Sequence, residues 1–143
     1  MRPRELALAI PKLRVYIGCF GSGLGHASRM LEVAQELSSR GVEVELSSSG
    51  EVAALIVRRG YRCNSLPLAD VRYSDSGEFA LKLTMLDSPS ILARTYHQLV
   101  SEVGYIDRFH PDVVLSDSAL STVLAGRFGS GWSSRAPGNA GTK

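Results

Sequence analysis

The order of apolar and polar stretches along the chain predicts alternating strands and helices. Residues 13–20 form an apolar run of strand length, which is typical of a strand buried on both faces of a parallel sheet. Apolar side chains then recur at helical spacing in residues 30–37, and Gly41 supplies a left-handed stop. Residues 42–47 alternate as a second strand. Strand, helix and strand within about 35 residues make one βαβ unit, which should cross over right-handed.

The same pattern continues with a shorter helix and a change of period. Residues 51–59 predict a helix closed by Gly60, and residues 61–66 predict a third strand. From residue 71 to residue 85 the apolar positions alternate, with turn residues at 75–77. This part of the chain therefore predicts an antiparallel hairpin that leaves the main sheet.

A long helix, a fourth strand and a last helix complete the pattern. Ser88 and Pro89 are typical of a helix start, and Pro111 ends the helix. One face of this helix is marked by Leu92, Tyr96, Leu99, Val103 and Ile106. Residues 112–116 predict a fourth buried strand. The last helix starts near Ser118, and we expect its inward-facing residues to be Leu120, Val123 and Leu124.

These elements predict one α/β domain of the Rossmann-like class, with an open, mainly parallel sheet flanked by helices and a β-hairpin excursion. The chain has 143 residues, 44% hydrophobic and 21% charged, enough for one domain with a real core. We expect an N-terminal extension at 1–12, the domain at 13–128, and a glycine-rich tail at 129–143 that cannot bury enough surface to fold. A further apolar strand normally follows the last helix. Its absence favours a chain cut short from a longer ancestor, with a natural short form as the alternative.

Charge and cysteine content exclude several classes of protein. The net charge is +2, but the basic excess lies in the first 14 and last 15 residues, so the body is mildly acidic and nucleic acid is not expected as a partner. Cys19 and Cys63 are too far apart for a CxxC motif and the three histidines are scattered, so no metal site is expected. Both cysteines should be buried free thiols, with a disulfide less favoured. No signal peptide or spanning segment is evident, which predicts a cytoplasmic protein with at most peripheral membrane contact.

A glycine-rich segment follows the first predicted strand, where ligands bind in open α/β sheets. Glycines at positions 21, 23 and 25 let backbone N–H groups approach a ligand, and the start of a helix favours negative charge. The segment is no P-loop, because Leu24 and Gly25 stand where lysine and serine or threonine belong. It is also no dinucleotide fingerprint: His26 replaces the last glycine, and the second strand ends in three serines rather than an acidic residue. A nicotinamide or flavin cofactor is therefore disfavoured.

The residues Gly21-x-Gly23-x-Gly25-His26-x-x-Arg29 resemble the GxGxGHxxR segment of GT-B glycosyltransferases. The strand Pro-Asp-Val-Val-Leu-Ser-Asp at 111–117 and the order of elements over 13–128 add to the resemblance, which lies near the group related to MurG and to plant glucosyltransferases. The resemblance implies two Rossmann-like domains, of which this chain supplies the N-terminal, acceptor-binding one. It also implies inverting transfer from a nucleotide sugar, UDP-linked by expectation, without a metal or resident cofactor. A donor-binding domain, on a separate chain or a longer one, would then be needed for activity.

The resemblance and the chemistry together suggest roles for single residues. His26 is the candidate base that takes a proton from the acceptor hydroxyl, with helix capping as the alternative. Asp117 is the candidate carboxylate that orients His26, or else an N-cap of the last helix. Ser22 is a candidate phosphate ligand or a solvent-facing serine. Arg29 is a candidate ligand for a diphosphate or a carboxylate, or else a partner of Glu32 or Glu36.

The acceptor and a rival function stay open at this level. The predicted hairpin offers apolar positions to an acceptor, and a lipid-linked acceptor is one option, although core packing is the commoner role of such positions. The rival function is a non-catalytic subunit or truncated remnant that binds an acceptor or partner without chemistry. A generic nucleotide-binding Rossmann domain is less favoured, because the fingerprint fails.

Overall fold

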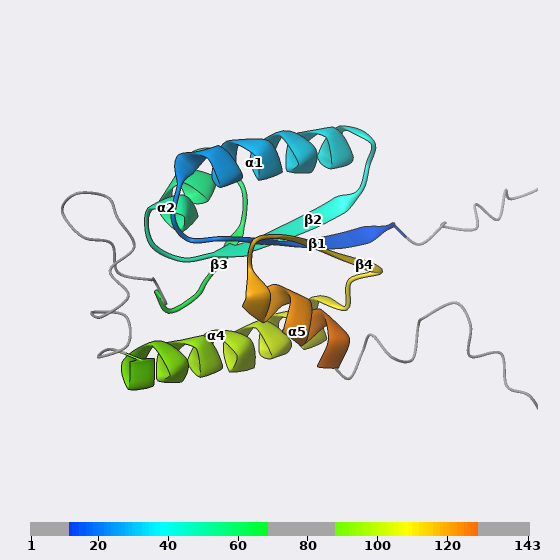
Figure 1. Cartoon of the computed structure of the whole chain (residues 1–143). Helices are drawn as coiled ribbons and strands as arrows, with labels where there is room; N and C mark the ends of the chain where they lie inside the picture. The colour runs from blue at the N-terminus through cyan, green and yellow to red at the C-terminus, as the bar shows by residue number, and fades with distance from the viewer. Residues whose placement is uncertain (1–11, 69–87, 129–143) are drawn as a thin grey trace, which may run out of the picture.

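A computed structural model describes residues 12–68 and 88–128, which form one parallel sheet with helices on both faces (Figure 1). The strands are β1 (Arg14–Cys19), β2 (Glu43–Ser48), β3 (Cys63–Ser65) and β4 (Val113–Asp117). Their order in the sheet is β3-β2-β1-β4, with every neighbouring pair parallel. The predicted Rossmann-like fold class is thereby confirmed. The predicted hairpin, the N-terminal extension and the tail lie outside the described residues.

In the described part of the chain, two helices cover each face of the sheet. Helices α1 (Leu24–Ser39) and α2 (Gly50–Arg58) lie on one face, and α4 (Ser88–Phe109) and α5 (Leu120–Phe128) lie on the other (Figure 1). Strand β1 contributes buried side chains to the core on both faces of the sheet, because successive side chains of a strand point to opposite faces. Ile17 is fully buried in the layer of α1 and α2, whereas Tyr16 is fully buried against Ile106 and Phe109 of α4. The predicted stops after α1 and α2 are confirmed: Gly41 has φ +82° and Gly60 has φ +86°.

Helix α5 packs very closely against β1, and this contact sets the distance between the sheet and the helices α4 and α5. A Cβ added at Gly18 would lie 1.8 Å from the Oγ1 atom of Thr122, so only glycine lets this helix reach the sheet. Thr122 and Ser47 of β2 both donate hydrogen bonds to Oε1 of Glu102, at 2.5 and 2.6 Å. All three side chains are fully buried. The carboxyl group of Glu102 therefore links α4, α5 and the centre of the sheet.

The predicted inner face of α5 is wrong in part. Leu120 and Val123 are 63% and 54% exposed, and the residues that α5 buries are Ser121, Thr122, Ala125 and Gly126. Small residues are needed there because the backbone of α5 lies close to β1 and β4, as the contact of Gly126 with Val114 shows. The large apolar side chains consequently turn away from the sheet.

The apolar face of α4 is buried only in its C-terminal half. Ile106 is 1% exposed, and Leu99 and Val103 pack against the core, as the helical spacing predicts. Leu92 and Tyr96, at the other end of the same face, are 72% and 63% exposed. This end of α4 instead borders the cavity described below.

Two further properties of the described residues bear on the predictions. Cys19 and Cys63 are both free thiols, and burial raises the pKa of Cys19 to about 12 and that of Cys63 to about 11. Cys19 is buried, but Cys63 only partly so. None of the described helices is long and apolar enough to span a bilayer.

Candidate functional site

The candidate site lies at the carboxyl ends of β1 and β4, which are neighbours in the sheet. The register places Cys19 of β1 opposite Asp117 of β4, and the backbone N–H of Phe20 donates to the Asp117 carbonyl at 3.1 Å. The chain then turns into α1, which begins at Leu24. The connection between β1 and α1 is therefore shorter than the sequence suggested: Gly25, His26 and Arg29 belong to the first two turns of α1. Gly23, with φ +89° at the N-cap, makes this early start feasible.

Three of the predicted site residues lie in direct contact. The Nδ1 atom of His26 lies 3.1 Å from Oδ1 of Asp117. Arg29 reaches the other carboxylate oxygen, Oδ2, through Nε at 3.1 Å and through a terminal nitrogen at 2.9 Å. The side chain of Asp117 is 14% exposed, that of His26 is 34% exposed and that of Arg29 is 60% exposed. Both carboxylate oxygens are thus occupied by residues of α1, and Glu36, a considered partner of Arg29, pairs with Arg40 instead.

The contacts favour one tautomer of the His26 ring. Nδ1 also lies 3.2 Å from the terminal nitrogen of Arg29, which would suit an Nδ1 that accepts a hydrogen bond. In that tautomer, however, Oδ1 of Asp117 would face a lone pair at 3.1 Å, which is repulsive. A hydrogen on Nδ1 gives Oδ1 a donor, and Arg29 already has Oδ2 as its acceptor. We therefore assign the hydrogen to Nδ1, which leaves Nε2 with a free lone pair.

The electrostatics of the cluster keep Asp117 ionised. The hydrogen bonds from Arg29 are the largest cause that lowers the pKa of Asp117 below its ordinary value. The hydrogen bond from His26 acts in the same direction, and partial burial opposes both. A carboxylate held in this state at neutral pH can stabilise a positive charge on the adjacent imidazole ring.

The side chain of Asp117 does not cap α5, although the turn before this helix directly follows it. Ser118 has φ +61°, an uncommon backbone conformation for a residue other than glycine. The hydroxyl of Ser116, rather than the carboxylate of Asp117, accepts the backbone N–H of Ala119, at 3.2 Å. The considered role of Asp117 as an N-cap is therefore not the one that its side chain adopts, because His26 and Arg29 take both of its oxygens.

The predicted ligand-binding glycines differ in what the structure requires of them. A Cβ at Gly21 would lie 1.9 Å from Oγ of Ser49, so glycine lets the connections after β1 and β2 touch. Gly25 has nothing within 4 Å of its Cβ position, and its φ is not positive. Neither packing nor backbone conformation in the described residues requires glycine at position 25. Ser22 is partly exposed, and the structure does not bring its side chain to the cluster of His26, Arg29 and Asp117.

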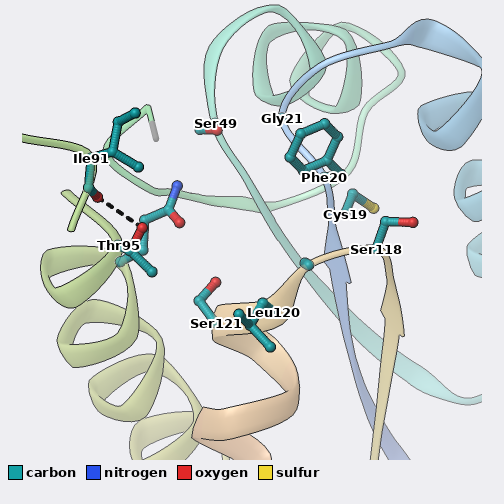
Figure 2. A pocket seen from close by; sticks show the side chains of 11 residues that line it. Cys19, Phe20, Gly21, Ser49, Ile91, Thr95, Ser118, Leu120 and Ser121 are labelled. Atoms are coloured by element: carbon teal, nitrogen blue, oxygen red, sulfur yellow. Dashed lines mark hydrogen bonds between the residues drawn. The ribbon is translucent and has the colours of Figure 1, made fainter. Parts of the chain in front are cut away.

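A cavity of about 250 Å³ lies beside this cluster, between the end of β1, the start of α5 and the first half of α4 (Figure 2). Phe20 connects the two, because its ring lies edge-on to the ring of His26 with 6.1 Å between the centroids. The remaining lining includes Ser49, Ile91, Gln98 and Ser121. None of these four residues is predicted to be functional from the sequence. The polar serines that directly follow β2 and β4 were the available signal.

Proteins related by sequence carry a glycosyltransferase name. A protein named an uncharacterized glycosyltransferase from Methanosarcina mazei is 32% identical over 117 residues, covering 79% of this chain and 29% of its own length. A protein of the same name from Methanosarcina acetivorans is 30% identical over 122 residues, with the same two coverages. No protein-family model matches the chain. The chain spans about 30% of the length of these relatives.

Solved glycosyltransferases share the fold. MurG of Acinetobacter baumannii superposes with a TM-score of 0.57 at 19% identity, over 82% of this chain and 32% of its own. SsfS6, a glycosyltransferase of Streptomyces sp. SF2575, gives a TM-score of 0.59 at 17% identity, over 80% of this chain and 36% of its own. Over the part that is matched, the chain is related by sequence to proteins named glycosyltransferases, and it shares the GT-B fold of these solved enzymes. Its described residues form a Rossmann-like domain of the kind expected for the N-terminal half of these enzymes.

Within this GT-B domain, the segment that first indicated the family is also the one that meets Asp117. His26 and Arg29 come from the GxGxGHxxR segment, and Asp117 closes the Pro-Asp-Val-Val-Leu-Ser-Asp strand. The described residues hold no group of three or more His, Cys, Asp or Glu side chains placed to bind a metal ion. The chemistry that these residues can offer is proton transfer at Nε2 of His26.

Proposed function

We propose that this GT-B domain binds the acceptor of an inverting sugar transfer and that His26 is its catalytic base. One observation carries the proposal: Nδ1 of His26 lies 3.1 Å from Oδ1 of Asp117, which leaves Nε2 free to take a proton. The ring is one-third exposed, so an acceptor can reach it. A neutral imidazole suits proton abstraction from a hydroxyl near pH 7.

The proposed step couples bond formation, proton transfer and bond cleavage. The acceptor oxygen attacks the anomeric carbon of the sugar and forms the new glycosidic bond. Its proton moves to Nε2 of His26, and Asp117 stabilises the resulting imidazolium. The bond between the anomeric carbon and the diphosphate breaks, and the nucleotide diphosphate leaves with the electron pair. Because attack and departure occur on opposite faces, the configuration at the anomeric carbon inverts.

The donor in this proposal is a nucleotide sugar, with a UDP-sugar as our first choice. The glycosyltransferase VinC, with a TM-score of 0.56 at 17% identity over 80% of this chain and 32% of its own, was solved in complex with dTDP, which supports a nucleoside diphosphate as the leaving group. The start of α1 adds a helix N-terminus that favours negative charge. Most contacts to the donor would come from a further domain, since the relatives are about three times as long as the part matched here. No resident cofactor is proposed.

The test uses an enzyme in which this chain replaces the matched part of the Methanosarcina mazei relative. We expect His26→Ala to lower kcat about 10²- to 10⁴-fold for transfer from UDP-sugars, the usual contribution of a general base. Ser28→Ala, on the same helix but exposed, is the matched control and should keep the wild-type rate. Full activity of the His26→Ala enzyme would contradict the role of His26 as base.

A further inference from the structure

The last two side chains of β4 lie on opposite faces of the sheet. Val114 packs in the layer of α4 and α5, whereas Leu115 packs in the layer of α1 and α2. Because side chains alternate along a strand, Ser116 lies on the α5 side and Asp117 lies on the α1 side. Their hydrogen bonds agree with this placement, since Ser116 bonds the residue before α5 and Asp117 bonds His26 of α1. The end of β4 is therefore tied to both helices.

The hydroxyl of Ser116 closes the turn between β4 and α5. It accepts the backbone N–H of Ala119 at 3.2 Å and donates to the carbonyl of the same residue at 2.8 Å. That carbonyl also accepts the backbone N–H of Val123, in α5, at 3.3 Å. One side chain thus holds both backbone groups of the residue from which α5 starts, and only two residues lie inside the closed turn.

The second of these two residues, Ser118, has an unusual backbone conformation. Its φ is +61°, in the left-handed region that residues with a side chain rarely adopt. Apart from glycines, only Ser118 and His110 have a positive φ in the described part of the chain. Such a conformation persists where surrounding contacts fix it, and here the two hydrogen bonds of Ser116 close around it. Figure 2 shows the chain turning at Ser118 from β4 towards α5.

The first residue inside the turn is Asp117, so the turn also limits where its carboxylate can lie. On the other side, the carbonyl of Asp117 accepts the backbone N–H of Phe20 at 3.1 Å. The side-chain contacts are short, at 3.1 Å to Nδ1 of His26 and 2.9 Å to Arg29. A hydrogen bond weakens steeply when its atoms leave this geometry. A small rotation of the backbone at Asp117 would therefore disturb both contacts.

We propose that Ser116 is a positioning residue of the site: by closing the turn at Ser118, its hydroxyl holds the carboxylate of Asp117 against His26. The hydrogen bonds of Ser116 go to Ala119, so it acts on the imidazole only through Asp117. The catalytic meaning of this role rests on the proposed function. The placement of the carboxylate, however, can be measured without any transfer reaction.

The tautomer of His26 is the first readout. Nitrogen-15 shifts of the imidazole in the whole 143-residue chain, at a pH where the ring is neutral, report which nitrogen carries the hydrogen. We expect Nδ1 in the wild type. Ser116→Ala should shift the tautomer ratio towards Nε2 about fivefold to tenfold, the effect of about one net hydrogen bond. Ser116 is exposed, so packing tolerates alanine, and Ser116→Thr keeps the hydroxyl and should restore the wild-type ratio. An unchanged ratio in Ser116→Ala, or a wild-type ring with its hydrogen on Nε2, would overturn the proposal.

Further variants separate the turn from a general loss of stability. Ser39→Ala is the matched control, because the hydroxyl of Ser39 donates to the carbonyl of Glu36 at 2.7 Å at the far end of α1. It should leave the tautomer ratio unchanged. Ser118→Gly adopts the left-handed conformation freely and should also keep the ratio. Ser118→Val should shift it as Ser116→Ala does, because a branched side chain disfavours that conformation. A wild-type ratio in folded Ser118→Val would contradict the proposal.

The second readout is transfer by the enzyme that joins this chain to the remainder of the Methanosarcina mazei relative. Ser116→Ala should lower kcat about tenfold or more, because a misplaced catalytic group is costly, and should change KM for the acceptor by less than about twofold. Ser116→Thr should restore kcat. A shifted tautomer ratio with unchanged kcat would reject His26 as the base and leave the positioning role of Ser116 standing. A lower kcat with an unchanged ratio would reject the positioning role instead.

Discussion

His26 and Asp117 meet at 3.1 Å although they belong to a helix and a strand that are far apart in the sequence. The contact follows from the order of the sheet, because β1 and β4 are neighbours and parallel, so their carboxyl ends reach the same edge. The early start of α1 brings His26 over that edge. The hydrogen bond from the backbone N–H of Phe20 to the carbonyl of Asp117 fixes the segments that follow β1 and β4 relative to each other. The geometry is thus held by the main chain as well as by the side chains.

Asp117→Asn tests the orienting role of the carboxylate. An amide can donate its own hydrogen to Nδ1 and so favour the tautomer with the hydrogen on Nε2, where the base is needed. The assay uses the chimeric enzyme in which this chain replaces the matched part of the Methanosarcina mazei relative. We expect its kcat to fall about 10²-fold or more, within the range for general base catalysis, with KM for the acceptor changed little. Steady-state kinetics measure this split. Glu32→Gln, an exposed carboxylate on the same helix as His26, is the control and should leave both constants unchanged. A rise in KM alone would assign Asp117 to substrate binding instead.

Arg29→Gln tests the electrostatic state of Asp117. Arg29 is the main cause that lowers the pKa of Asp117, so its removal should raise that pKa towards the ordinary value. A carboxyl group with a lowered pKa in the folded state stabilises the fold above its unfolded pKa, and this contribution is lost as the pH falls through the folded pKa. The variant should therefore be less stable than the wild type at neutral pH, and the difference should vanish in strongly acidic solution.

Urea denaturation of the two proteins across the acidic range measures this difference, and NMR titration of the Asp117 carboxyl gives the pKa directly. Arg40→Gln is a matched control, because Arg40 pairs with Glu36 on the exposed side of α1. It should leave the pKa of Asp117 unchanged. A constant stability difference at every pH would mean that Arg29 contributes packing rather than charge.

Gly25→Ala separates the needs of the fold from those of the ligand. Nothing lies within 4 Å of the added Cβ, and the residue is helical, so alanine should raise the free energy of unfolding by up to about 1 kcal/mol. If the open face of α1 receives the substrates, the same methyl group should lower transfer about tenfold or more. Thermal unfolding and transfer rates on one preparation distinguish the two effects. A stabilised variant with full activity would show that no ligand approaches Gly25.

Much of this fold follows from local patterns in the sequence. The apolar run of β1, the helical spacing of α1 and the glycine stops at 41 and 60 each depend on neighbouring residues, and each is confirmed. The contact of His26 with Asp117 could also be predicted from the sequence, because the carboxyl ends of parallel strands lie at one edge of the sheet. Their catalytic roles stay predictions.

The features that could not be predicted from the sequence depend on distances between helices and strands. The inner face of α5 was assigned from large apolar residues, but close approach to Gly18 and Val114 admits only small ones. Arg29 forms its ion pair with Asp117 rather than with a neighbour on its own helix, and this choice likewise depends on where β4 ends. The cavity serines, Ser49 and Ser121, have no motif around them and are found only when α2, α4 and α5 are assembled.

Gly18→Ala tests the close approach that positions α5 and, through it, the turn that follows Asp117. The new methyl group would lie 1.8 Å from Oγ1 of Thr122, whose hydroxyl bonds the buried Glu102. Relief requires a shift of α5 away from the sheet, and we expect a loss of about 1–3 kcal/mol in the free energy of unfolding. Gly104→Ala on α4 is the control: with nothing within 4 Å of its Cβ, it should stabilise the chain by about 0.5–1 kcal/mol. Chemical denaturation of both variants measures the pair. Equal stability of the two variants would mean that α5 does not rest on Gly18.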